Sequence, residues 1–177
     1  IHDVTGPDEY TCIVNNNYYT NALARHNLEW AVRFARLLDG GGAHAAELAQ
    51  FEEIARNICL PYDEKLGINP QDDAFLNKKV WDFAATPAEN HPRRRHYHPV
   101  CLYRHQVGKQ ADTVLAHMIL EDYQSEAVMR RSFEYCESIT THDSSLSTCI
   151  FSIMAARLGM REKAFRYFGE SAKLDLF

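Results

Sequence analysis

The sequence predicts an all-α protein built from helical hairpins, and three observations support this fold class. Most of the 177 residues fall into segments whose apolar side chains recur at spacings of three and four, the period of an amphipathic helix. Glycine and proline interrupt this pattern where neighbouring segments meet. No segment shows a strong strand pattern of alternating apolar and polar residues. Six or seven helices with short links fit either a bundle or a solenoid of helix pairs.

The first two predicted helices cover residues 20–38 and 45–59. The glycine-rich residues 39–42 end the first, and Pro61 ends the second because proline disfavours helix in the residue before it. A short glycine hinge between two helices predicts that they pack as an antiparallel pair. The apolar residues expected on their buried sides are Leu23, Trp30, Phe34, Leu37, Leu38, Leu48, Phe51, Ile54, Ala55 and Ile58.

The middle of the chain is expected to be less regular. Residues 72–83 predict a shorter helix that carries Phe75, Val80 and Trp81. Residues 86–99 contain three prolines and the basic run 93–96, which indicates a long loop of the kind that a compact domain usually keeps for a function. Four further helices with short links are predicted at residues 108–122, 125–138, 144–158 and 160–173.

The amino-acid composition limits the classes of protein to which the chain can belong. The chain is 46% hydrophobic with a formal net charge of -5, so it has residues for a core and no general attraction to nucleic acid. No apolar run approaches the roughly 18 residues of a membrane span, and the first residues lack the features of a signal peptide. We therefore expect a cytoplasmic protein without a membrane partner. Five scattered cysteines without a CxxC pair predict reduced, half-buried thiols rather than disulfides or a zinc site.

Residues 140–147 are the most informative stretch of the sequence. They place His142, Asp143 and several hydroxyls just before an apolar helix, whose first backbone N–H groups have no helical partner. Helix N-termini of this kind bind phosphate readily. The stretch therefore predicts an oxyanion site, although a plain N-cap formed by His142, Asp143 or Ser144 explains the same residue types.

Adjacent acids follow a predicted turn near the start of the chain. Gly6 and Pro7 favour the turn, and Asp8 and Glu9 come directly after it. Neighbouring residues on a turn can point in different directions, so one acid can donate a proton while the other holds the loop. The alternative is an acidic first helical residue, which the helix dipole favours.

Residues 106–112 place Lys109, Gln110 and Asp112 at the start of the helix predicted at 108–122. Successive helical positions turn by about 100 degrees, so at least one of these side chains should face a polar cavity. Lysine and glutamine suit sugar hydroxyls, and an ordinary solvated first turn is the alternative. The acidic turn at residues 67–73 can order a loop or contact substrate, but its oxygens do not have the spacing of a calcium loop.

Three blocks together resemble one enzyme family. They are Thr-Gly-Pro-Asp-Glu-Tyr at residues 5–10 with the asparagine-rich residues 14–21, Tyr-Arg-His-Gln-Val-Gly-Lys-Gln-Ala-Asp at 103–112, and Thr-Thr-His-Asp-Ser-Ser-Leu-Ser at 140–147. In this order they resemble the inverting disaccharide phosphorylases of glycoside hydrolase family 65, which include maltose, trehalose, kojibiose and nigerose phosphorylases. Cys12 stands where the family often has His, and Thr148 where it often has Pro.

The resemblance implies a role for individual residues. Glu9 is expected to be the general acid that protonates the glycosidic oxygen. Asp143 is expected to orient its neighbours, since a carboxylate would repel an anion. The residues expected to bind substrates are Lys109 and Gln110 for the glucose ring, and His142, Ser144 and Ser145 for inorganic phosphate.

The implied reaction explains these residue types. Phosphate is already a nucleophilic anion at neutral pH, so a phosphorylase needs no carboxylate base, whereas an inverting hydrolase does. Glu9 donates the proton to the leaving sugar if burial raises its pKa. The expected product from an α-linked glucoside is β-glucose 1-phosphate. Inorganic phosphate is then a co-substrate, and no metal ion or organic cofactor is expected.

The resemblance also implies a larger molecule. Catalytic domains of the family are twelve-helix (α/α)6 barrels, so residues 1–177 are expected to form a single all-helical segment from the second part of such a barrel. The Trp-Asp segment that holds glucose is expected in the first part, the full-length protein is expected to be a homodimer, and the segment alone is expected to be inactive or nearly so. An acid trehalase-type hydrolase and a non-catalytic helical binding module are the alternatives. The intact residues 142–145 argue against the hydrolase.

Overall fold

The structure is a computed structural model that describes residues 1–40, 42–174 and 176. It is mostly helical, which confirms the predicted all-α class. Gly41, part of the expected glycine hinge, lies outside the described residues. The α-helices are α1 (Tyr18–Asp39), α2 (Ala45–Asn57), α3 (Pro99–Tyr103), α4 (Asp112–Ile119), α5 (Glu126–Ile139), α6 (Ser145–Arg157) and α7 (Arg161–Ala172). Single 3-10 turns lie at Phe75–Asn77, Ala88–Asn90, Arg93–Arg95 and Glu121–Tyr123.

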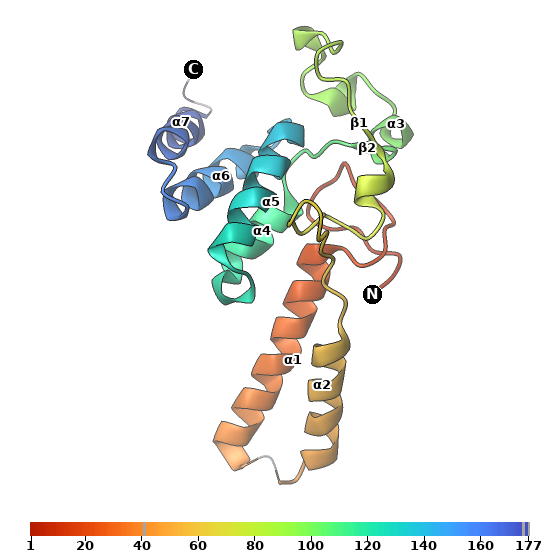
Figure 1. Cartoon of the computed structure of the whole chain (residues 1–177), viewed down its shortest axis with the longest axis vertical. Coiled ribbons are helices and arrows are strands. Elements are labelled where there is room, and N and C mark those ends of the chain that lie inside the picture. The colour runs from red at the N-terminus through yellow and green to blue at the C-terminus, as the bar shows by residue number, and fades with distance from the viewer. Residues whose placement is uncertain (41, 175, 177) are drawn as a thin grey trace.

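Helices α1 and α2 form an antiparallel hairpin that projects from the rest of the molecule (Figure 1), as the sequence predicts. Asn17 begins α1, because its side-chain oxygen accepts a hydrogen bond of 3.0 Å from the backbone N–H of Thr20. Gly40 ends α1 in a left-handed conformation (φ 70°) that glycine adopts without strain.

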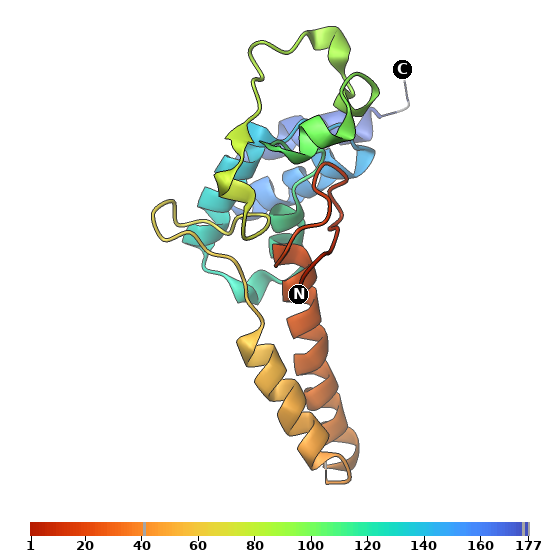
Figure 2. The same ribbon diagram turned by 90° about the vertical axis from the view of Figure 1, so that its right-hand side faces the viewer.

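The far end of this hairpin exposes apolar side chains that the sequence places on a buried side. Phe34, Leu37 and Leu38 are 52%, 71% and 85% exposed, so the prediction is wrong for these residues. The hairpin extends beyond the other helices (Figure 2), and α2 covers one side of α1. At the other end of α1, Tyr18 and Ala22 are buried against α4.

Helices α4 to α7 form a helical layer on one side of the molecule (Figure 1). Helix α4 packs against α5 and α6, and α6 packs against α7. Phe133, Phe151 and Met154 are at most 1% exposed and belong to the core of this layer. The structure confirms the helices predicted at 125–138, 144–158 and 160–173 within one residue at each end. No helix formed by the described residues has the length and apolar character needed to cross a membrane.

The other side of the molecule is a loop layer, residues 1–17 and 58–111 (Figures 1 and 2). It contains two short parallel strands, β1 (Lys79–Val80) and β2 (His105–Gln106). The helix predicted at 72–83 is wrong, because this segment forms one 3-10 turn and then β1. The Gln106 side-chain amide donates to the carbonyls of Leu76 and Lys78 at 3.2 and 2.5 Å, which gives these groups partners outside a helix.

Candidate active site

The acid turn (residues 4–14) is closed by a backbone bridge between its two ends. Gly6 lies directly against α4, where a Cβ atom would be 2.1 Å from Asp112 Oδ2. Glycine is therefore required for this close approach. The backbone N–H of Asp8 donates a hydrogen bond of 2.7 Å to Asp112 Oδ1 and so holds the turn on the first residue of α4.

Asp8 keeps the acid turn in shape. It is fully buried, and its carboxylate accepts hydrogen bonds from the backbone N–H groups of Tyr10 and Lys109 at 3.1 and 2.9 Å and from the Gln71 amide at 2.7 Å. Burial raises the pKa of Asp8, and these hydrogen bonds oppose the rise. Burial, followed by the charge of Asp8, raises the pKa of Asp112 to about 8. Asp8 is thus the acid that holds the loop, and Gln71 shows that the acidic turn at 67–73 helps to order it.

Glu9 points away from the turn, and its side chain is 60% exposed. Its carboxylate lies 2.9 Å from Lys109 Nζ and 3.6 Å from the guanidinium of Arg94. The hydrogen bond from Lys109 is the main reason why the pKa of Glu9 is lowered, and the charge of Arg94 acts in the same direction. The condition stated for proton donation, a pKa of Glu9 raised by burial, is therefore not met here, because the carboxylate is exposed and adjoins two cations.

Lys109 and Gln110 precede α4 instead of lying within it, so the helix predicted at 108–122 is wrong at its start. The backbone N–H of Lys109 donates to Asp8, and Gly108 pairs in parallel with Thr140. These partners hold the segment extended. Gln110 donates from Nε2 to a backbone carbonyl of the acid turn at 2.9 Å. The structure therefore brings both residues to the acid turn, and their expected role in glucose binding stays a prediction.

A cavity of about 320 Å³ adjoins Gln110 between the acid turn, α4 and α6. Gln110, Asp112 and Ser147 contribute polar groups to an otherwise mostly apolar lining. Gln110 and Asp112 face this cavity, but its wall is mostly apolar, so the prediction that a residue at 106–112 faces a polar cavity is wrong here.

Residues 140–147 lead into α6 as the sequence predicts. Ser144 is the N-cap, and its hydroxyl accepts a hydrogen bond of 3.2 Å from the backbone N–H of Leu146. His142, Ser144 and Ser145 line a second cavity, of about 290 Å³, beside the start of α6. Glu170 of α7 also lines this cavity, and its carboxylate disfavours an anion on that side.

His142 is held between the start of α6 and the core of the helical layer. Its backbone is left-handed (φ 54°), and its Nδ1 lies 2.8 Å from the hydroxyl of Ser147. Its ring packs against Phe151 and Tyr167 with centroid distances of 4.7 and 5.2 Å. Burial is the main cause that lowers the pKa of His142 to about 4. At neutral pH the imidazole therefore offers a hydrogen bond and no positive charge.

Asp143 joins three separate segments of the chain. Its side chain is fully buried, and Oδ2 accepts hydrogen bonds from the hydroxyl of Tyr10 and from the backbone N–H of Arg93, the latter at 2.8 Å. Oδ1 lies 2.6 Å from His91 Nδ1. The backbone N–H of Arg94 donates to the Tyr10 hydroxyl at 3.1 Å. The acid turn, the basic loop (residues 86–98) and residues 140–147 thus meet at one carboxylate.

The sequence assigned no role to Tyr10, His91 or Arg94. The one available signal is the basic run at 93–96 within a long loop of the kind that a compact domain usually keeps for a function. Tyr10 and Asp143 are 133 positions apart, so no periodicity or spacing rule relates them. The contact depends on the tertiary fold.

The described residues contain no group of three or more His, Cys, Asp or Glu side chains placed to hold a metal ion. The cysteines are free thiols. Cys12 and Cys149 are half-buried as expected, whereas Cys136 is buried and Cys59 and Cys101 are exposed.

Comparisons with known proteins show that this chain is similar to carbohydrate-active enzymes. Residues 1–177 match the sequence model described as "Glycosyl hydrolase family 65 central catalytic domain". An alpha,alpha-trehalose phosphorylase of Geobacillus stearothermophilus is 56% identical over an alignment of 188 residues, which covers 99% of this chain and 25% of that protein. A kojibiose phosphorylase of Escherichia coli (strain K12) is 35% identical over 178 residues, which cover 99% of this chain and 23% of that protein.

A solved structure shares the fold. A putative kojibiose phosphorylase from the human microbiome superposes with a TM-score of 0.86 at 28% identity, over 99% of this chain and 26% of its own length. The mostly helical structure and this match fit the expected piece of an (α/α)6 barrel. The chain spans about a quarter of the length of the curated relatives it matches.

Proposed function

Because the chain belongs to glycosyl hydrolase family 65, as its three sequence blocks predicted, we propose that the protein containing it is an inverting phosphorylase of α-linked glucose disaccharides. In this reaction inorganic phosphate cleaves the disaccharide to β-glucose 1-phosphate and glucose. The relatives support the class, since their names include trehalose, kojibiose and maltose phosphorylases. The 56% identity to a trehalose phosphorylase makes trehalose the first substrate to test.

One observation carries the proposal: the three sequence blocks meet around Glu9. Lys109 contacts the Glu9 carboxylate, and Gln110 contacts the acid turn. Asp143 accepts a hydrogen bond from Tyr10, which follows Glu9 in the chain. The three blocks that carry the candidates for proton donation, glucose binding and phosphate binding are therefore joined by direct contacts. A plain N-cap or a plain surface turn would not require such contacts.

Glu9 is proposed as the general acid. Lys109 and Arg94 lower its pKa, which opposes this role. A phosphate anion bound nearby would offset these cations and disfavour the Glu9 carboxylate, so it would raise the pKa of Glu9. We therefore place the protonation of Glu9 after phosphate binding. Phosphate itself is the nucleophile, which removes the need for a carboxylate base.

Phosphate is proposed to bind at the N-terminus of α6. The hydroxyls of Ser144 and Ser145 and the first backbone N–H groups of the helix suit an oxyanion there. The neutral imidazole of His142 adds a hydrogen bond. Lys109 and Gln110 are proposed to hold the glucose ring, and no metal ion or organic cofactor takes part.

The proposal extends to a longer polypeptide, because the chain covers only about a quarter of its relatives. We propose that residues 1–177 are one all-helical segment from the second part of an (α/α)6 catalytic domain. The remaining part would supply the glucose-binding wall. The full-length protein is proposed to be a cytoplasmic homodimer, and the isolated segment to be inactive or nearly so.

The test is an assay of the full-length protein on trehalose, kojibiose, nigerose and maltose with and without phosphate. The proposal predicts that glucose 1-phosphate is released and that turnover requires phosphate. Equal turnover without phosphate would instead indicate the acid trehalase-type hydrolase. No turnover on any disaccharide would favour a non-catalytic helical module. Phosphate-dependent turnover by the isolated 177-residue chain would contradict the claim that the segment is incomplete.

A further inference from the structure

Tyr10 and Asp143 connect the two halves of the proposed reaction. Tyr10 follows Glu9 in the chain, Asp143 follows His142, and the Tyr10 hydroxyl donates a hydrogen bond to Asp143 Oδ2. The Asp143 side chain is fully buried, and Tyr10 is 2% exposed. Asp143 is among the residues around the second cavity, but its carboxylate is turned to protein partners and not to solvent. Both side chains are therefore placed to act through their neighbours rather than by touching the substrate.

The same two side chains hold the basic loop. Asp143 accepts a hydrogen bond of 2.8 Å from the backbone N–H of Arg93, and the Tyr10 hydroxyl accepts one of 3.1 Å from the backbone N–H of Arg94. The guanidinium of Arg94 lies 3.6 Å from the Glu9 carboxylate. The contact thus reaches Glu9 by two routes, through the backbone at Tyr10 and through the Arg94 side chain.

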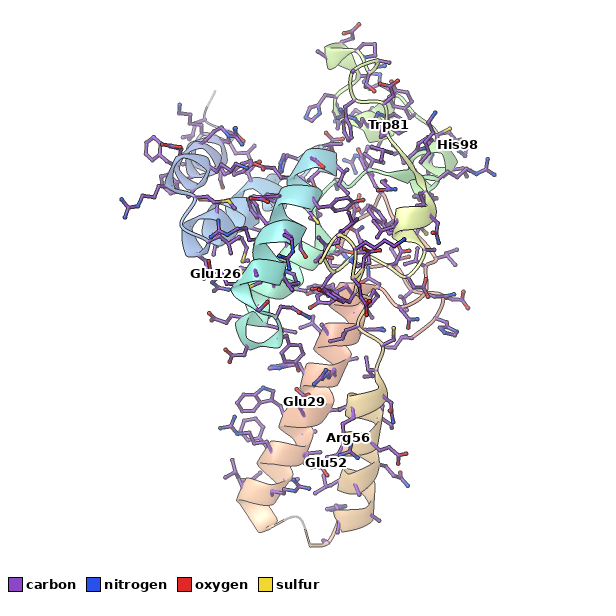
Figure 3. All side chains as sticks on the ribbon, viewed as in Figure 1. Glu29, Glu52, Arg56, Trp81, His98 and Glu126 are labelled. Atoms are coloured by element: carbon purple, nitrogen blue, oxygen red, sulfur yellow. The ribbon has the colours of Figure 1, made fainter. Side chains whose placement is uncertain are left out.

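The Tyr10 ring is fixed independently of its hydroxyl. It packs in a cluster with Trp81, Leu102 and Val107 in the loop layer, where Figure 3 labels Trp81. A phenylalanine at this position keeps the ring and removes only the hydroxyl. The substitution Tyr10→Phe therefore isolates the hydrogen bonds from the packing.

We propose that Tyr10 and Asp143 are positioning residues that transmit the occupancy of the phosphate site to Glu9. This inference rests on the proposed function. Phosphate bound at the N-terminus of α6 fixes the backbone on either side of Asp143. A buried carboxylate cannot leave its partners without a large desolvation cost, so the Tyr10 hydroxyl follows Asp143. The orientation of Glu9 then follows Tyr10.

The experiment compares Tyr10→Phe with Tyr123→Phe in the full-length protein. The Tyr123 hydroxyl also donates a hydrogen bond to a carboxylate, that of Glu29 on α1, so it is a matched control outside the site. Each variant is assayed at saturating phosphate on two substrates. One is whichever of trehalose, kojibiose, nigerose and maltose the wild type cleaves. The other is α-glucosyl fluoride, whose fluoride leaves without a proton from Glu9.

Tyr10→Phe is expected to lower kcat on the disaccharide by about tenfold to a hundredfold, as for a lost hydrogen bond to a charged group. On α-glucosyl fluoride the loss is expected to stay below about threefold, because the general acid is not required. Tyr123→Phe should keep both rates within about twofold of the wild type. Asp143→Asn should also slow disaccharide cleavage, and the double variant with Tyr10→Phe should be about as slow as the slower single variant, since the two residues act as one unit.

Equal losses on the two substrates would overturn the inference, because Tyr10 would then act on phosphate binding or folding and not on Glu9. An effect of Tyr10→Phe no larger than that of Tyr123→Phe would overturn it as well. Additive losses for Tyr10→Phe and Asp143→Asn would show that the two residues act separately. Each of these results leaves the proposed function standing, since that function is judged by the phosphate requirement of the wild type.

Discussion

The α1–α2 hairpin and the loop layer place charged side chains in opposite surroundings. On the hairpin, where Figure 3 labels Glu52, the side chains of the Arg36–Glu52 ion pair are 54% and 35% exposed. In the loop layer Asp8 is fully buried and surrounded by hydrogen-bond donors. Surface charges can be replaced singly, whereas a buried charge supports the backbone that it pairs with. This contrast between exposed and buried charges indicates that buried polar side chains maintain the irregular backbone around Glu9.

The largest expected effect is a loss of activity from a substitution near the acid turn that a matched substitution on the hairpin does not cause. Replacing Glu9 with Gln should lower kcat on the disaccharide by about a hundredfold to ten-thousandfold, because a proposed general acid is lost. Glu52→Gln is the matched control, since Glu52 is also a partly exposed acid paired with a cation. It should leave the rate unchanged. Steady-state assays with phosphate on the full-length protein measure both. Comparable rates for Glu9→Gln and wild type would remove Glu9 from the mechanism.

A second comparison uses two glycines. Gly6→Ala would put a Cβ atom 2.1 Å from Asp112 Oδ2 and 2.7 Å from Asn17 Nδ2, so the acid turn must shift. We expect the free energy of unfolding to fall by about 1–3 kcal/mol, as for other overpacked sites, and disaccharide cleavage to be lost with it. Gly42→Ala, at the tip of the hairpin, places its added Cβ more than 4 Å from every neighbouring atom that the structure describes, so it should be neutral. Urea titrations of the two variants measure their free energies of unfolding. Equal values for Gly6→Ala and Gly42→Ala would show that the acid turn is not tightly held.

His117 tests a buried group where the helical layer meets the loop layer. It is 1% exposed on α4, and its Nε2 lies 3.0 Å from Asn69 Oδ1. Burial lowers the pKa of His117 from 6.5 to about 4. The unfolded chain therefore takes up the proton first as the pH falls, so the contribution of neutral His117 is complete above pH 6.5 and is lost as the pH approaches 4.

The measurement is the difference in unfolding free energy between wild type and His117→Gln. Relative to the variant, the wild type should lose about 2 kcal/mol of unfolding free energy between about pH 7 and about pH 5. Asp112 and His142 also titrate with shifted pKa values, but they are present in both proteins and cancel in the difference. A difference that does not change with pH would contradict the shifted pKa of His117.

The sequence predicts the two regions unequally well. Helices α5 and α6 agree within one residue because their signals are local: a serine N-cap at Ser125 or Ser144, followed by apolar residues at helical spacing. The loop layer depends on distant partners. Within residues 72–83 the carbonyl of Lys78 pairs with the side chain of Gln106 instead of a helical partner, and the Asp143 carboxylate holds the backbone of the basic loop at Arg93.

The sequence predicts which residues belong to the candidate site, but not the electrostatic surroundings of their side chains. The blocks containing Glu9, Lys109 and Ser144 were identified, and the structure brings the first two into direct contact. The direction of the pKa shift of Glu9 could not be predicted, because it depends on Lys109 and Arg94, which reach the acid turn only after folding. Local patterns therefore predict helices and candidate residues, whereas electrostatics requires the tertiary contacts.

The start of α6 allows a smaller effect to be measured. Replacing both Ser144 and Ser145 with Ala should raise the KM for phosphate by about tenfold with little change in kcat, because proposed phosphate ligands are lost. Ser125→Ala is the control, since Ser125 caps α5 in the same way, through a hydrogen bond from the backbone N–H of Val128. It should cost about 1 kcal/mol of stability without changing that KM. An equal KM for phosphate in the wild type, the double variant and Ser125→Ala would show that Ser144 and Ser145 do not bind phosphate and that Ser144 only caps the helix.

The smallest expected effect concerns the ion pair between Arg36 and Glu52, with 2.8 Å between its charged groups. A double-mutant cycle with Arg36→Gln and Glu52→Gln should give a coupling energy below about 1 kcal/mol, because exposed charges are already well solvated. Salt should reduce the coupling further by screening. A coupling above about 2 kcal/mol that resists salt would mean that the hairpin pair behaves like the buried charges of the loop layer. Exposure would then not explain why the two regions differ, and the buried contacts around Asp8 and Asp143 would need another reason for their place at the candidate site.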